Sequence, residues 1–280
     1  MPILNELTSP SEAPPQVFRS PKEARAAYPV IERVEDVFSE QLTDNVRFDF
    51  FRMDESVEEW VQLLGPDVLF LTHPHESARL THDFVTTHDA YSQPIGNKLR
   101  NDLYTAPWIH DMGELKIEGE GVGDIAFDKK TEDDEHKEMK IFESVITALA
   151  QPQDAADLLN VYHSIAMDKQ SPLGQRFNAI ERVGYTETAM RSYLGYRGQR
   201  IENWQGLSGN VLRNQIPALL DMAKTYPYVD IFLSENKTVL SAMFRDIAGK
   251  DVPFNKNGEA AYEPSQLINA KNAWESSAYS

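Results

Sequence analysis

Cysteine is absent from the 280 residues of this chain. Its absence excludes disulfide scaffolds, cysteine-ligated zinc sites, iron–sulfur clusters and thiol nucleophiles. Positive charge is also scarce, because 27 Lys and Arg residues stand against 44 Asp and Glu residues, giving a net charge of −17. Gripping a nucleic-acid backbone or an anionic membrane needs a cationic surface. The composition therefore argues against a nucleic-acid polymer or a membrane as partner.

Long hydrophobic runs are missing as well. No window approaches the roughly 18 apolar residues that a membrane helix needs, and the N-terminus has no basic region followed by an apolar run. We therefore expect a cytoplasmic protein. Hydrophobic residues make up 41% of the chain, enough for a packed interior.

Apolar residues recur at helical spacing over most of the chain, which predicts an all-α protein. Four segments are expected: a flexible, proline-containing arm (1–20), an N-terminal extension packed on the core (21–70), a helical domain (71–205), and a C-terminal helical extension and tail (206–280). Within them we expect helices near 77–90, 97–112, 132–149, 154–167, 173–193, 210–224 and 237–248. The apolar run 67–72 fits a strand or the buried start of a helix.

The residues that point to chemistry lie at 110–114, His-Asp-Met-Gly-Glu, followed by Gly123 and Asp124. A neighbouring His and Asp at the end of an apolar helix face are costly to bury unless something compensates them. A divalent metal does so, because imidazole nitrogen and carboxylate oxygen both bind such ions. His82, 28 residues before His110, and a carboxylate near Glu181 could complete the ligand set.

This constellation resembles the HD-domain metal-dependent phosphohydrolases, and among them the small nucleotidases that act on deoxynucleoside 5′-monophosphates. The likeness covers about residues 75–200. It implies an HD-domain helical bundle with N- and C-terminal extensions, a homodimer as in many members of that family, and a small phosphorylated substrate of the nucleotide kind. It also implies one divalent metal ion (Mn, Co, Mg, Fe or Zn).

The resemblance assigns a role to each matching position. His82, His110, Asp111 and Glu181 would bind the metal, and Glu114 and Asp124 would position or deprotonate the attacking water. Arg79 and Arg182 are candidates for holding the phosphate.

Three features depart from the family pattern. Glu181 stands where the family has Asp, the segment between Glu114 and Asp124 is longer, and Pro107 should kink or interrupt the helix that leads to His110. The Gly-rich run 119–123 fits a hinge or lid beside the site.

Two alternatives remain open from the sequence. The first is a non-catalytic sensor or scaffold of the HD fold, which the Glu181 replacement favours. The second is a dinuclear HD-type oxygenase, which would use His136 or His163 as further ligands. His75 could also replace His82 as the upstream ligand, whereas His73 and His88 fit ordinary structural histidines.

Overall fold

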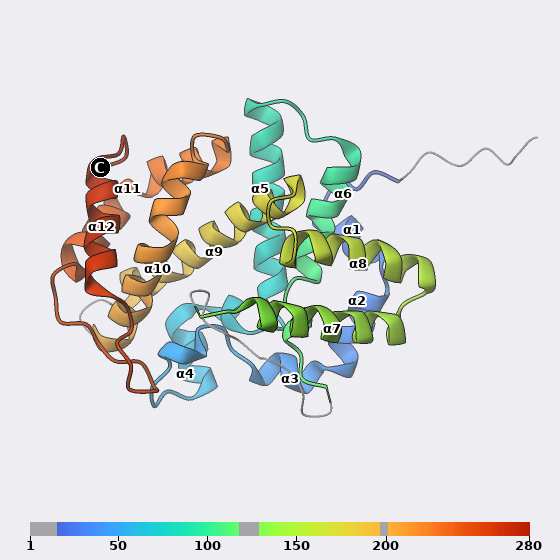
Figure 1. The fold of residues 1–280 in the computed structure, drawn as a ribbon, viewed down its shortest axis with the longest axis horizontal. Helices are drawn as coiled ribbons and strands as arrows, with labels where there is room; N and C mark the ends of the chain where they lie inside the picture. The colour runs from blue at the N-terminus through green and yellow to red at the C-terminus, as the bar shows by residue number, and fades with distance from the viewer. Residues whose placement is uncertain (1–15, 118–128, 197–200) are drawn as a thin grey trace, which may run out of the picture.

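The computed structural model describes residues 16–117, 129–196 and 201–280. These residues form helices and no β-strand, with only two isolated bridges, Val46–Leu69 and Phe254–Ala260. The predicted all-α class is therefore confirmed for the described residues (Figure 1). The α-helices are α1 (Pro21–Ala27), α2 (Val30–Val37), α3 (Ser39–Asp44), α4 (Val57–Leu64), α5 (His73–Tyr91), α6 (Asn97–Thr105), α7 (Glu132–Leu149), α8 (Pro152–Ala166), α9 (Pro172–Tyr196), α10 (Ile201–Met222), α11 (Pro227–Ile247) and α12 (Pro264–Glu275). Short 3₁₀ helices are η1 (Asp49–Phe51), η2 (Pro66–Val68), η3 (Ala106–Trp108) and η4 (Met112–Glu114).

Helix α9 lies at the centre of the molecule, where it contacts α4, α5, α6, α8, α10 and α11 (Figure 1). Its buried side chains include Phe177, Ile180, Val183 and Tyr193, which do not share one narrow stripe. A helix that is apolar on several sides can be covered on several sides. This explains why the helix that carries Glu181 is surrounded by other elements.

The helix pair α7 and α8 forms one side of the fold. Helix α7 begins at a capping box, in which Thr131 and Asp134 bond each other's backbone N–H groups, and its first turn is acidic as the helix dipole favours. The rings of Phe142 and Tyr162 stack with centroids 3.9 Å apart and join the two helices. Helix α7 also packs against η4, which ends the segment that carries His110 and Asp111.

The expected helix at 97–112 is interrupted as Pro107 predicted. Helix α6 ends at Thr105, and a 3₁₀ turn with Pro107 in it leads to His110. The run 67–72 is neither a strand nor the start of a helix: it holds the end of η2 and the bridge from Leu69 to Val46.

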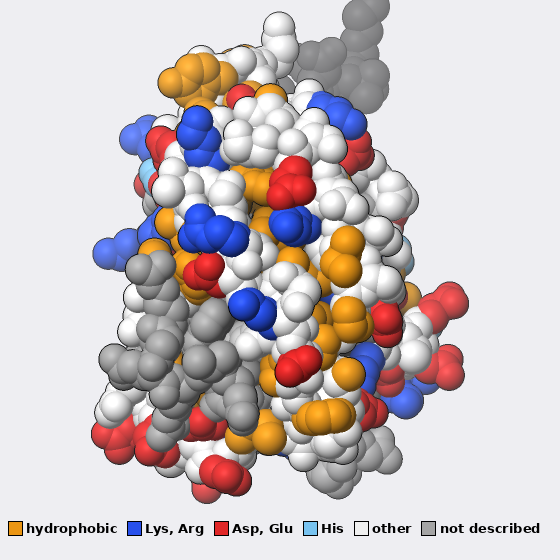
Figure 2. Space-filling view, turned by 90° about the vertical axis from the view of Figure 1, so that its left-hand side faces the viewer, with side chains coloured by type: hydrophobic (Ala, Val, Ile, Leu, Met, Phe, Trp, Pro, Cys, Tyr) orange, Lys and Arg blue, Asp and Glu red, His pale blue; other side chains and the backbone are white. Residues whose placement is uncertain are grey.

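Helices α10 and α11 pack on α9 and on each other, and α12 packs on α10. Helix α12 lies in the polar tail, where the sequence pattern predicted no specific helix. On the face in Figure 2, basic, acidic and apolar side chains are interspersed. Within the described ranges, none of the helices combines the length and apolar character needed to cross a bilayer.

Candidate metal centre

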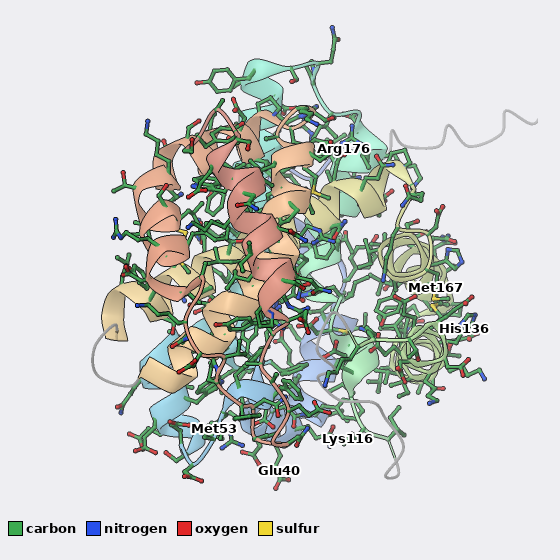
Figure 3. The ribbon with its side chains drawn as sticks, turned by 60° about the vertical axis from the view of Figure 1, so that its left-hand side comes forward. Glu40, Met53, Lys116, His136, Met167 and Arg176 are labelled. Carbon is green, nitrogen blue, oxygen red and sulfur yellow. The ribbon has the colours of Figure 1, made fainter. Side chains whose placement is uncertain are left out.

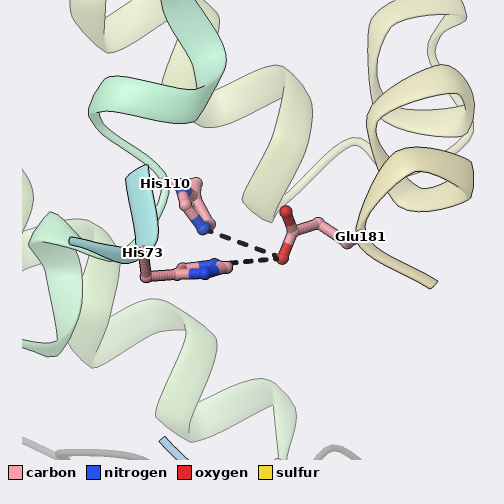
Figure 4. A group of neighbouring side chains, drawn as sticks. All are labelled: His73, His110 and Glu181. Atoms are coloured by element: carbon pink, nitrogen blue, oxygen red, sulfur yellow. Dashed lines mark ion pairs between the residues drawn. The ribbon is translucent and has the colours of Figure 1, made fainter. Parts of the chain in front are cut away.

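Three side chains from separate elements meet at one point beside α9. His73 is the first residue of α5, His110 follows η3, and Glu181 lies in the middle of α9. One potential ligand atom from each lies within 4.8 Å of the others (Figure 4). Asp111 is adjacent, with Oδ1 3.1 Å from His110 Nε2 and Oδ2 3.7 Å from His73 Nε2. The structure thus brings together two imidazoles and two carboxylates.

His110 presents a free nitrogen to the carboxylates. Its Nδ1 lies 2.9 Å from the carbonyl oxygen of Pro107, so Nδ1 carries the proton and donates it. Nε2 then faces Asp111 and Glu181. Among the described residues, His110 Nε2 and Asp111 Oδ2 are buried atoms with no hydrogen-bond partner. An imidazole nitrogen that faces two carboxylates requires a cation or a proton between them.

Glu181 is the carboxylate that both histidines face. Its Oε1 accepts a hydrogen bond from Ser77 Oγ at 2.9 Å, which leaves Oε2 turned toward His110 Nε2 at 3.7 Å and His73 Nε2 at 3.8 Å. Burial alone would raise the pKa of Glu181, but the neighbouring His110, His73 and Arg47 outweigh burial and hold the pKa well below its usual range. Glu181 is therefore ionised at neutral pH.

His73 is fully enclosed and its two nitrogens have different partners. Arg47 Nη1 lies 2.7 Å from Nδ1, and Ser77 Oγ lies 3.2 Å from Nε2. A guanidinium has only donors, so Nδ1 must accept and Nε2 must carry the proton. Burial, with the charge of Arg47 next, lowers the pKa of His73 below its usual value. His73 is accordingly a neutral imidazole at pH 7.

These residues fit a divalent metal ion. Two ligands each about 2.1 Å from one ion lie about 3.0–3.4 Å apart, so the 3.7–3.8 Å separations around Glu181 Oε2 exceed that spacing by only about 0.5 Å. The carbonyl that fixes His110 Nδ1 is the usual outer partner of a metal-bound imidazole. His73 fits less directly, since its Nε2 carries a proton while Arg47 occupies Nδ1.

His110, Asp111 and Glu181 form part of the wall of a cavity of about 290 Å³, which His73 does not line. That cavity is lined by both signs of charge and by aromatic rings. Its basic side chains are those of Arg47, Lys130, Lys169 and Arg182, and its aromatic side chains are those of Tyr162, Phe177 and Tyr185. Its acidic side chains are those of Asp111, Glu114, Glu135, Glu138 and Glu181.

A buried ion pair lies beside the cluster. Lys130 Nζ is 2.7 Å from Glu138 Oε2 and 3.5 Å from Glu114 Oε1. Burial, opposed by Lys130 and reinforced by Asp111, raises the pKa of Glu138.

Gly113 permits the close approach of α7 to the turn at His110 and Asp111. A Cβ at this position would overlap the Tyr162 hydroxyl and lie 2.8 Å from the Glu138 carbonyl oxygen. Any side chain larger than that of glycine at position 113 would therefore force α7 further from the His110–Asp111 turn.

The structure brings together His110, Asp111 and Glu181 as the sequence predicts, with Glu114 in the same cavity. It places His82 elsewhere: this residue is exposed on α5, with its ring beside that of Tyr104, and the upstream imidazole of the cluster is that of His73. His75, the other candidate, is exposed and packs edge-on against Trp108.

The two arginines proposed for phosphate binding have different surroundings. Arg79 is exposed and pairs with Glu76, Asp83 and Glu187, away from the residues that line the cavity. Arg182 lines the cavity, where burial lowers its pKa and Gln215 accepts a hydrogen bond from it at 2.6 Å.

The remaining candidates lie apart from the cluster or outside the described residues. Asp124 and the Gly-rich run 119–123 fall outside the ranges that the structure describes. His136 and His163 are exposed, and His136 lies on the outer side of the α7–α8 pair (Figure 3). Neither contributes to the cavity wall, so the described residues offer no support for the dinuclear oxygenase.

Sequence reasoning missed His73 and Arg47. His73 stands 37 residues before His110, longer than the spacing chosen, but it shares a helix face with Ser77 four residues later, and both are buried. A buried polar pair at helical spacing is the signal that could have identified it. Arg47 carries no comparable signal, because only the folded chain brings residues 47 and 73 together.

Comparisons with known proteins add no assignment: no protein-family model, curated protein or solved structure matches this chain.

Proposed function

We propose that the protein is a metal-dependent phosphohydrolase of the HD type, which cleaves a phosphate ester of a small nucleotide such as a 5′-monophosphate. The observation that carries the proposal is the pair of buried, unpartnered atoms, His110 Nε2 and Asp111 Oδ2, beside the ionised carboxylate of Glu181. This donor set lies in the wall of a cavity with four basic side chains. Metal ligands and cations within one cavity suit an anionic phosphoryl group.

His73, His110, Asp111 and Glu181 would hold the ion, which when bound supplies an acidified water and neutralises a phosphoryl oxygen. Glu114 lines the same cavity, 3.5 Å from Lys130 Nζ, and would accept a proton from the attacking water. Arg182, Lys130 and Lys169 offer positive charge to the phosphate. The role of Asp124 stays a prediction from the family resemblance.

Small size of the substrate follows from the cavity and the overall charge. A cavity of about 290 Å³ accommodates a molecule of the size of a mononucleotide. A net charge of −17 disfavours a polyanion, whereas local cations can still attract a small one. A mononucleotide in solution in the cytoplasm satisfies both conditions.

A second function, a non-catalytic sensor, is favoured by one contact. Arg47 donates to His73 Nδ1 and thereby leaves a proton on the nitrogen that a metal would need. A cavity in which an internal cation already neutralises Glu181 could bind a nucleotide without turning it over.

The test combines metal binding with turnover. Metal-free protein is loaded with Mn, Co, Mg, Fe or Zn, and phosphate release is measured over nucleoside mono-, di- and triphosphates. We expect His110→Gln to lose at least about 100-fold in both metal affinity and release, because removal of a ligand costs more than loss of its outer partner. His82→Gln is the matched control, an exposed imidazole on α5, and should stay within about twofold of the wild type.

Release that requires metal and His110 but not His82 supports the hydrolase. Metal retention without release from any nucleotide would refute the hydrolase and favour the sensor.

A further inference from the structure

The segment before α4 brings an arginine into the metal centre on a fixed backbone. Arg47 N–H donates to the carbonyl of Val68 at 2.7 Å, and Trp60 Nε1 donates to the Arg47 carbonyl at 3.0 Å. The next residue, Phe48, has φ +60°, a left-handed conformation that is rare for a bulky residue. Strain of this kind persists only where surrounding contacts impose it. The backbone at 47–48 is thus held in place, so any displacement of the guanidinium requires a change in the side-chain conformation of Arg47.

The guanidinium of Arg47 places a positive charge next to His73 and Glu181. Its Cζ lies 4.9 Å from the ring centroid of Tyr185 and 5.4 Å from that of Phe48. Nη1 is 2.7 Å from His73 Nδ1 and Nη2 is 3.7 Å from Glu181 Oε2. Arg47 is 7% exposed, so these contacts form away from bulk water. The same side chain therefore bonds one potential metal ligand and partly neutralises another.

The hydrogen bonds run in one direction from Arg47. Arg47 donates to His73 Nδ1, His73 Nε2–H faces Ser77 Oγ at 3.2 Å, and Ser77 donates to Glu181 Oε1 at 2.9 Å. Coordination of a metal by His73 needs the lone pair of Nε2, which moves the single proton of the neutral ring to Nδ1. Nδ1–H would then face the Arg47 N–H, and two donors cannot share a contact of 2.7 Å.

We propose that Arg47 and a divalent metal ion compete for His73 and Glu181, so that Arg47 is a built-in cation that metal loading must displace. This rests on the proposed function, because it concerns the same metal centre. In the metal-free centre, the charge of Arg47 offsets that of Glu181. Because metal binding must displace Arg47, the metal affinity is lower than the four ligands alone would give. The N-terminal extension thereby regulates loading of a site that the central helices build.

Competition is tested first by metal affinity. Mn²⁺ titrations followed by electron paramagnetic resonance compare the full-length wild type with Arg47→Gln. We expect Arg47→Gln to bind Mn²⁺ about tenfold more tightly, since loss of a charged hydrogen bond removes the competitor. The matched control is Arg100→Gln, which removes the same charge from an ion pair with Asp89 outside the cavity and should leave Mn²⁺ affinity unchanged.

The position of the proton on His73 gives a readout that needs no turnover. Long-range ¹H–¹⁵N correlation spectra of histidine-labelled protein distinguish the two tautomers, and His73→Gln assigns the signal. We expect Nε2–H in the metal-free wild type and Nδ1–H after Zn²⁺ is added. Metal-free Arg47→Gln should lose the Nε2–H preference, while Arg100→Gln keeps it.

Failure of this inference and failure of the proposed function give different results. Equal or weaker Mn²⁺ binding by Arg47→Gln, or an Nδ1–H tautomer in the metal-free wild type, overturns the competition and leaves the hydrolase standing. Tighter binding by Arg47→Gln without phosphate release supports the competition and refutes the hydrolase. Binding of neither ion by wild type or variant overturns both.

Discussion

Trp60 and Trp274 are both completely buried indoles, one in the N-terminal segment and one in the C-terminal segment. Each donates one hydrogen bond, Trp60 to the carbonyl of Arg47 and Trp274 to Ser241 Oγ at 2.9 Å. The first bond fixes the backbone of a residue whose side chain contacts the metal centre. The second hydrogen bond joins α12 to α11, and neither Trp274 nor Ser241 lines the cavity.

Equal burial therefore has different consequences in the two segments. Helices α10 and α11 pack against α9. Helix α10 is connected to the cavity only indirectly, through the hydrogen bonds that Arg182 donates to Gln215 Oε1 and to the Asn214 carbonyl. Residues 45–48 of the N-terminal segment instead place a charged side chain against His73. A flanking segment belongs to a site when it contributes a buried charge there, not when it contributes packing area.

The largest effects should come from the two indoles. Trp60→Ala and Trp274→Ala should each lower the free energy of unfolding by about 3–5 kcal/mol, because each leaves a large cavity. Urea denaturation with and without Mn²⁺ measures both this loss and the stabilisation that Mn²⁺ adds. Only Trp60→Ala should alter the Mn²⁺ increment, since it releases the backbone of Arg47. An equal change of that increment in Trp274→Ala would refute the distinction between the segments.

The sequence predicted the features that depend on local patterns and missed those that depend on long-range contacts. Amphipathic spacing located the helices around α5, α7, α8 and α9, because apolar faces are local patterns. The adjacency of His110 to Asp111 was read directly from the sequence, and Glu181 was predicted from the position of the last ligand in the family that the chain resembles. Helix α12, in the C-terminal tail, was not predicted because its few buried residues lie among polar ones. These buried residues are Leu267, Ala270 and Trp274.

The choice of His82 over His73 illustrates what spacing cannot decide. Both residues lie on α5, nine positions apart, and a motif distance alone cannot say which end of the helix approaches His110. That depends on the turn at 66–72 and on the bridge between Val46 and Leu69, which fix where α5 begins. The same long-range contact brings Arg47 to the site, so both omissions have one physical cause.

Substitution of two glycines compares the metal centre with the C-terminal segment again, with smaller expected losses of stability. A Cβ at Gly113 would collide with Tyr162 and with the backbone of Glu138, and a Cβ at Gly209 would overlap the ring of Tyr262 in the C-terminal segment. Gly113→Ala and Gly209→Ala should each destabilise the protein by about 1–3 kcal/mol through overpacking.

Their effects on the metal centre should differ. Gly113→Ala pushes α7 away from the turn that holds His110 and Asp111, so Mn²⁺ binding should weaken, whereas Gly209→Ala should keep wild-type affinity. Thermal unfolding and Mn²⁺ titration of the two variants provide the measurement. Wild-type Mn²⁺ affinity in a destabilised Gly113→Ala would show that the close approach of α7 does not position the ligands.

The smallest effect is a pH dependence that belongs to the central part of the chain, because residues 206–280 contain no histidine. Burial and Arg47 lower the pKa of His73, and burial and Arg176 lower that of His88. Below pH about 6.5 the unfolded chain binds protons at these positions that the folded protein does not. Stability is therefore complete above pH about 6.5 and falls as the pH is lowered, by at most about 1.4 kcal/mol per pH unit for the enclosed His73 and by less for His88, which solvent screens.

Urea unfolding of the metal-free protein at pH 7.5, 6.5 and 5.5 measures this slope, and His73→Gln should reduce it more than His88→Gln, because His73 is enclosed and His88 is partly exposed. Arg47→Gln should also flatten it, since removing the neighbouring charge makes protonation of folded His73 less costly. A slope that survives in His73→Gln would place the pH dependence outside the metal centre and would separate Arg47 from the neutral state of His73.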